Sequence, residues 1–141
     1  MTYIFKNLTK SKIRALFYIL GSNNNFKKRI NPSEFTNDDG LLRGIQARNS
    51  YNEYEYTLSV QEDNYLHISN IDGLLDIKYD ISQLQLVVDE YDDIINSIYF
   101  LEYNSTNRIG IWKRKVNEVS DDLDWLKFLE YVKLFADLVV D

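Results

Sequence analysis

Pairs of neighbouring carboxylates are the first residues in this sequence whose type and spacing could support catalysis. Glu53 and Glu55 form one pair, and Asp76 and Asp80 form another. Hydrolysis by two carboxyl groups requires one of them to be desolvated, so that its pKa rises, and both to flank a cleft. Adjacent sites on an exposed sheet face meet neither condition. We therefore interpret both pairs as solvated side chains.

The stretch from Asp89 to Asp93 (Asp-Glu-Tyr-Asp-Asp) is rich enough in oxygen atoms to suggest a calcium loop. An EF-hand loop also needs a Gly at its sixth position and a Glu at its twelfth. Here those positions hold Ile94 and Phe100. We therefore expect an acidic bend that is solvated or binds a protein, and no metal site.

His67 is the only histidine, and Cys is absent. The strand pairing predicted below directs His67 outward, between Ser59 and Lys78. A neighbouring lysine disfavours a metal there, so an ordinary surface histidine is the preferred interpretation and a general base is the alternative. The absence of Cys excludes disulfides, thiolate metal sites and a Cys nucleophile.

No nucleotide-binding or nucleophile motif is present. The five Gly residues form neither a P-loop nor a dinucleotide fingerprint, and no Gly-x-Ser-x-Gly elbow occurs. The basic run at 27–29 lacks interleaved aromatic residues, and the formal net charge of −6 opposes binding to nucleic acid. We expect no cofactor and no nucleic-acid partner.

The acidic residues are concentrated in the middle of the chain. Residues 49–107 carry twelve Asp and Glu and a single basic residue, Lys78, whereas residues 1–48 have a formal charge of +6. An acidic surface speeds and orients association with basic proteins. We therefore predict a basic protein partner, such as a toxin or nuclease domain.

The acidic middle also alternates as antiparallel strands do. Apolar residues recur at every second position from Tyr54 to Val60. Two hairpins then fix the pairing, one through a three-residue loop at 62–64 and one through the turn at Asp72-Gly73. The predicted pairs are Val60 with Leu66, Leu58 with Ile68, Ile68 with Ile77, and Leu66 with Tyr79.

The N-terminal third is less regular. Residues 2–5 suggest a strand, and Thr9 can cap a helix that Gly21 ends. Because Lys10 and Lys12 are unfavourable at a helix N-terminus, a strand is the alternative there. Further along, residues 31–34 suggest one helical turn, residues 41–48 are ambiguous, and residues 83–88 suggest a strand.

A last hairpin is predicted from residues 94–103 and 108–115, joined by a four-residue loop. This loop length places Phe100 opposite Ile111 and Tyr99 opposite Trp112. If the aliphatic side faces the core, Tyr99, Tyr103 and Trp112 stay at least partly exposed beside Arg108. Exposed Tyr and Trp are common anchors at interfaces. If both sheet faces are covered, the three aromatic residues belong to the core instead.

The C-terminal segment is predicted to be a helix capped by Ser120. Its apolar stripe should lie on the sheet and consists of Trp125, Phe128, Leu129, Val132, Phe135, Ala136 and Val139. Leu123, Leu126 and Leu134 fall on the otherwise polar side, where either the N-terminal helix or a partner would cover them.

These features predict one α+β domain over residues 1–141: a mostly antiparallel meander of five or six strands, with the N- and C-terminal helices packed on one face. No apolar run approaches the ~20 residues of a membrane span, so we expect no membrane partner. The lack of Cys fits a reducing cytoplasm, and the many Asn with few Ala suggest a bacterial or phage source.

We predict a non-catalytic acidic inhibitor of a basic partner, foremost a bacterial immunity protein that neutralises a nuclease-type toxin. One alternative is a phage protein that mimics nucleic acid to block a defence enzyme. Another is a small-molecule or nucleotide-binding module with a pocket between helices and sheet. The oligomeric state is not indicated. The residues predicted to contact the partner are Glu53, Glu55, Asp89, Glu90, Tyr91, Asp92, Asp93, Tyr99, Tyr103 and Trp112.

Overall fold

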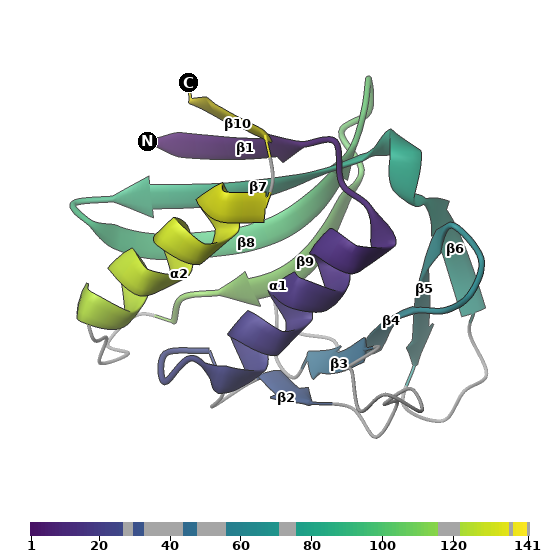
Figure 1. Ribbon diagram of the computed structural model, residues 1–141, viewed down its shortest axis with the longest axis horizontal. Coiled ribbons are helices and arrows are strands. Elements are labelled where there is room, and N and C mark those ends of the chain that lie inside the picture. The colour runs from purple at the N-terminus through teal and green to yellow at the C-terminus, as the bar shows by residue number, and fades with distance from the viewer. Residues whose placement is uncertain are drawn as a thin grey trace.

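The computed structural model describes residues 1–26, 30–32, 44–47, 56–70, 76–115, 122–135 and 137–140. These residues form two α-helices, one 3₁₀ turn and ten strands (Figure 1). The helices are α1 (Lys10–Ser22) and α2 (Asp122–Phe135), and the 3₁₀ turn is η1 (Ile81–Gln83). The strands are β1 (Thr2–Lys6), β2 (Ile30–Pro32), β3 (Gly44–Ala47), β4 (Tyr56–Val60), β5 (Tyr65–Asn70), β6 (Asp76–Asp80), β7 (Leu84–Tyr91), β8 (Ile94–Glu102), β9 (Arg108–Lys113) and β10 (Asp137–Val140).

The strands form two antiparallel sheets in place of the single meander that the sequence predicted. One sheet has the order β10-β1-β7-β8-β9, and the other has the order β2-β3-β4-β5-β6. Between β6 and β7 the chain makes the turn η1, in which the Asp80 side chain accepts a hydrogen bond from the Ser82 amide at 2.9 Å. This turn separates the two sheets, while β1 enters the first sheet beside β7. The α+β class and the antiparallel pairing are confirmed.

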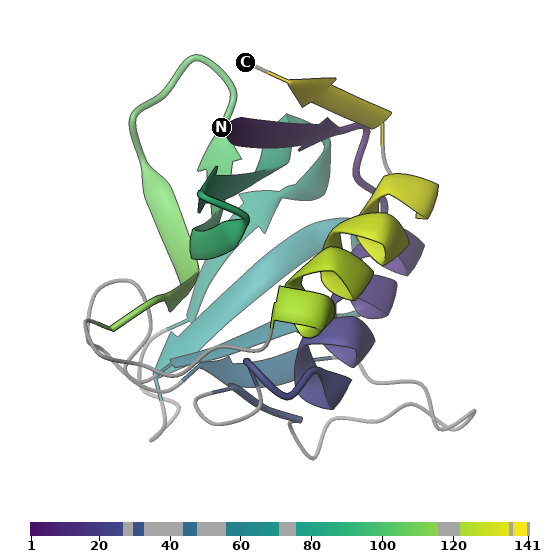
Figure 2. The same cartoon turned by 90° about the vertical axis from the view of Figure 1, so that its left-hand side faces the viewer.

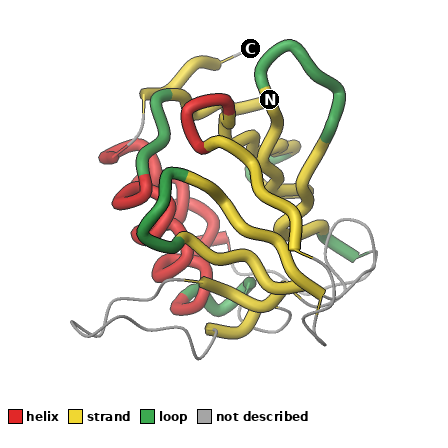
Figure 3. Tube along the Cα trace, turned by 90° about the vertical axis from the view of Figure 1, so that its right-hand side faces the viewer, coloured by secondary structure: helices red, strands yellow, loops and turns green. Residues whose placement is uncertain are grey.

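Both helices lie on one side of the strands (Figures 2 and 3). Helix α1 packs on β2, β3 and β4, α2 packs on β8, and the two helices contact each other. The buried side chains between these layers form one hydrophobic cluster that includes Phe5 of β1, Phe17 of α1, Leu66 of β5 and Phe128 of α2. Residues of both sheets therefore share a core.

Helix α1 begins where its cap was predicted. Thr9 has extended backbone angles, and its side chain accepts a hydrogen bond from the Lys12 amide at 3.2 Å. The apolar residues at helical spacing are all buried: Ile13, Leu16, Phe17 and Leu20. The alternative of a strand here is wrong, because a strand would place these four residues on different faces.

The hairpins of the second sheet have the predicted register. Leu58 pairs with Ile68, Val60 with Leu66, and Ile68 with Ile77. The Asp72-Gly73 turn itself lies outside the described residues. In contrast, the helical turn predicted at 31–34 is wrong over its first half, since Asn31 and Pro32 belong to β2. A Pro is tolerated there because β2 is an edge strand.

The predicted register of the last hairpin is wrong. Trp112 lies opposite Ile98, and Gly110 lies opposite Tyr99, so β9 contains one extra residue, Ile111, at this step. Such a bulge reverses which residues face each side beyond it. Trp112 therefore lies on the core side with Ile98 and is 1% exposed.

The C-terminal helix is shorter than predicted. Trp125, Phe128, Leu129 and Val132 are buried as expected, but α2 ends at Phe135 and residues 137–140 form β10. Val139 therefore pairs with Ile4 of β1 and does not extend the helical stripe. Ser120 lies outside the described residues. Among the described residues, neither helix is long and apolar enough to cross a membrane.

Candidate functional site

The acidic stretch forms the end of the hairpin between β7 and β8. Strand β7 continues to Tyr91, which pairs with Ile94, so the turn contains only Asp92 and Asp93. Both turn residues have positive φ, 53° and 62°, as a type I′ hairpin turn requires. Both are exposed, and Tyr91 is 71% exposed. We call Tyr91, Asp92 and Asp93 the acidic tip.

Asp89 lies below the acidic tip and is occupied by internal contacts. Its carboxylate accepts hydrogen bonds from the Thr2 hydroxyl at 2.9 Å and from the Ser97 hydroxyl at 2.8 Å. Thr2 and Ser97 are its neighbours across the ladders to β1 and β8. Asp89 therefore connects three strands and is not a freely accessible charge.

Glu90 supports the acidic tip from within the hairpin. One carboxylate oxygen accepts a hydrogen bond from the Asp93 amide at 2.7 Å, and the other lies 3.6 Å from the Met1 amino group. The Met1 amino group also donates to the Glu90 carbonyl. These contacts support the observed conformation of the turn.

The negative field of this hairpin acts on a neighbouring tyrosine. Burial raises the pKa of the Tyr3 hydroxyl, and the charges of Glu90 and then Asp93 raise that pKa further. Tyr3 belongs to β1, where it pairs with Val88 of β7. The charges of Glu90 and Asp93 thus act on the strand beside the hairpin.

The structure does not join the predicted aromatic residues to the acidic tip. Trp112 is in the core, and Tyr99 is only 5% exposed, so the prediction that they are open on the sheet surface is wrong. The Arg108 guanidinium lies over the Tyr99 ring, 4.6 Å from its centroid. Tyr103 is half-buried at the opposite end of the β7–β8 ladder, where its amide bonds to the Gln83 carbonyl. Glu53 and Glu55 lie outside the described residues.

His67 is buried, contrary to the prediction of a surface histidine. It does lie between Ser59 and Lys78 in the sheet, but it is only 6% exposed. Its Nε2 lies 2.9 Å and 3.0 Å from the two carboxylate oxygens of Asp63. This hydrogen bond lowers the pKa of the Asp63 carboxyl below its ordinary value. Neither residue type nor spacing marks this pair in the sequence, because a four-residue spacing predicts side-chain contact in a helix and not in a hairpin.

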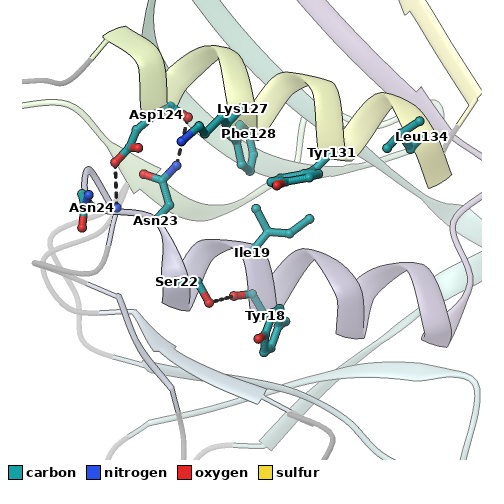
Figure 4. A pocket seen from close by; sticks show the side chains of 10 residues that line it. All are labelled: Tyr18, Ile19, Ser22, Asn23, Asn24, Asp124, Lys127, Phe128, Tyr131 and Leu134. Carbon is teal, nitrogen blue, oxygen red and sulfur yellow. Dashed lines mark hydrogen bonds between the residues drawn. The ribbon is translucent and has the colours of Figure 1, made fainter.

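An open groove of about 630 Å³ runs between α1 and α2 (Figure 4). Exposed Tyr18, Tyr131 and Leu134 border it, together with buried Phe128. At one end Asp124 joins the helices: its carboxylate accepts from the Asn24 amide, and its carbonyl accepts from the Asn23 side chain, both at 3.0 Å. The groove lies between the helices, whereas the predicted ligand pocket lay between helices and sheet.

Neither a metal-ligand cluster nor a match to a known protein gives these sites a role. The described residues contain no cluster of three or more His, Asp or Glu able to hold a metal ion. No family model matches the chain, and the comparisons with curated proteins and with solved structures found no match.

Proposed function

We propose that this protein is a non-catalytic binding protein whose acidic tip contacts a basic protein. The observation that carries the proposal is the exposure of Tyr91, Asp92 and Asp93 on a turn held by Glu90. Acidic groups of this kind accelerate encounter with a basic surface, and an exposed Tyr contributes apolar contact area.

The most specific form of the proposal is a bacterial immunity protein that neutralises a nuclease-type toxin. Nuclease domains bind a polyanionic substrate through Lys and Arg side chains. The acidic tip, with two carboxylates beside the Tyr91 ring, complements such a surface and would exclude the substrate from it. The charge of −11 over residues 49–107 provides the long-range attraction.

A phage inhibitor that mimics nucleic acid would use the same chemistry against a defence enzyme. The two forms differ in the partner and not in the surface. Identification of the bound protein, or of a toxin gene beside the gene for this chain, separates them.

The proposal is tested by replacing Asp92 and Asp93 together with Asn. Asn tolerates the left-handed backbone conformation, so the turn is retained while two negative charges are removed. The matched control is Glu62→Lys, which changes the net charge equally at the exposed β4–β5 loop. A tagged protein is used to capture partners from the native host at low and high salt.

We expect the paired Asp→Asn variant to slow association with the captured basic protein about tenfold or more at low salt, and Glu62→Lys to slow it less. The rate for the parent protein should fall as salt rises. Equal rates for the parent and the paired variant, or a rate independent of salt, would refute the role of the acidic tip.

A further inference from the structure

The outward face of α2 exposes large apolar side chains. Leu126 is 50% exposed, Tyr131 is 52% exposed and Leu134 is 81% exposed, although the opposite stripe of the helix is fully packed. Tyr18 of α1, which borders the groove between the helices, is 67% exposed. Several such residues on one face indicate an interaction surface, whereas isolated ones need no explanation.

Four of the five charged residues of α2 alternate in sign along the helix. Asp124, Lys127, Glu130 and Lys133 follow at intervals of three residues, and the last three are exposed. Their formal charges sum to zero, although the whole chain carries −6. These four residues therefore add no net charge to a contact between two copies of this acidic protein.

This pattern is self-complementary when two α2 helices run antiparallel. A two-fold axis level with the Phe128–Leu129 peptide places Lys127 of each copy level with Glu130 of the other. These two residues lie about 60° apart around the helix, near the middle of its outward face, and Leu126 and Tyr131 lie on the two edges of that face. The central base of each copy thus meets the central acid of the other, as an isologous interface allows. A parallel arrangement would place each charge beside its own copy.

We propose that a second copy of this chain docks on the outward face of α2, forming a two-fold symmetric dimer through antiparallel α2 helices. The groove between α1 and α2 gives Tyr131 and Leu134 of the partner a recess beside Tyr18 (Figure 4). Since the surface is distinct from the acidic tip, each dimer carries two tips.

The test is the mass in solution of the full chain, measured by analytical ultracentrifugation from about 1 µM to about 500 µM. The parent should associate to a dimer within this range. Lys127→Glu and Glu130→Lys should each weaken the dimer about tenfold or more, because each variant opposes like charges across the axis twice. Both residues are exposed, so far-UV circular dichroism and the thermal midpoint should remain near those of the parent.

The decisive experiment mixes the two single variants. A heterodimer of Lys127→Glu with Glu130→Lys regenerates an opposite-charge pair at both positions, so the mixture should recover the dimer that each variant alone loses. The double variant Lys127→Glu with Glu130→Lys should also dimerise. The paired Asp→Asn variant of the acidic tip should keep the mass of the parent.

A parent that stays monomeric over the whole range would overturn the proposal. So would a dimer that neither single variant weakens, or a mixture of the two single variants that fails to recover association. None of these results bears on binding through the acidic tip, because that surface is tested by its own variant.

Discussion

The indole rings of Trp112 and Trp125 lie 5.3 Å apart between centroids, with their planes tilted by 58°. The Phe26 ring stands edge-on to Trp112 at 5.1 Å and is inclined by 63° to Trp125 at 5.0 Å. These residues come from β9, from α2 and from the segment after α1. The aromatic cluster therefore attaches the C-terminal helix to the first sheet.

Truncation of either indole should destabilise the protein strongly. Trp112→Ala and Trp125→Ala each leave a cavity among buried rings, and such changes typically cost about 3–5 kcal/mol. Urea unfolding measures the free energy of unfolding for each variant. The control is Tyr91→Ala, an aromatic truncation at a 71% exposed position, which should cost far less. If the Trp112→Ala protein were as stable as the control, the Trp112 side chain would have to point away from the core.

Asp89 should contribute to stability and not to partner binding. Asp89→Ala leaves the Thr2 and Ser97 hydroxyls without their acceptor, and Ser97 is only 7% exposed. Buried hydroxyls left unsatisfied cost about 1–3 kcal/mol. Asp89→Asn keeps one acceptor oxygen and should lose less. Chemical denaturation of the three proteins checks this order, and Asp89→Ala matching the parent would contradict it.

The hairpin turn should respond to backbone substitutions at Asp93. Its φ of 62° is available to Gly without steric cost, whereas a β-branched residue is strained there. Asp93→Gly should therefore raise the thermal midpoint or leave it unchanged, and Asp93→Val should lower it. Since both variants remove the same carboxylate, the difference between them isolates the backbone effect. Equal midpoints would exclude the type I′ turn.

Acid should weaken the protein partly through Asp63. Its folded-state pKa is lowered, chiefly by the hydrogen bond to His67, below the ordinary value of 3.8. A lowered carboxyl pKa stabilises the fold above the unfolded-state pKa, and this contribution is lost as pH falls through the folded-state pKa. Carbon-13 NMR titration should show Asp63 titrating below 3.8.

Removal of the Asp63 carboxyl tests the same linkage. Asp63→Asn should lose less stability between neutral and acid pH than the parent does. Glu62→Gln, next to it in the same loop, is the control and should follow the parent. An Asp63 that titrates at or above 3.8 would contradict the effect of His67.

Local turn chemistry explains which part of the fold the sequence predicts. The three-residue loop after Val60 specifies the register of β4 and β5, and that register is observed. No comparable signal marks the extra residue at Ile111, because a bulge adds one residue without changing composition. Missing it assigned Trp112 to the wrong face. The strand at 137–140 continues the helical spacing of Val132, and only pairing with β1 distinguishes it.

For the candidate site too, local features could be predicted from the sequence and long-range contacts could not. The exposure of Asp92 and Asp93 agrees with a solvated bend, as expected for consecutive acids in a turn. The internal roles of Asp89 and Glu90 were missed in part because one partner of each, Thr2 and Met1, lies at the far end of the sequence. Contacts between residues so far apart in the sequence can be predicted only once β1 is known to lie beside β7.

The position of β1 has a kinetic consequence during synthesis. Among the strands that the structure describes it is made first, yet it lies between β7 and β10, which leave the ribosome much later. The backbone N–H and C=O groups of β1 therefore lack their strand partners while most of the chain is translated. The first sheet is complete only after residues 137–140 emerge. Pairings so distant in sequence form slowly, and the waiting strand is an edge to which other nascent chains can add. The yield of folded protein in the cell should thus depend on translation rate and on chaperones that cover this strand.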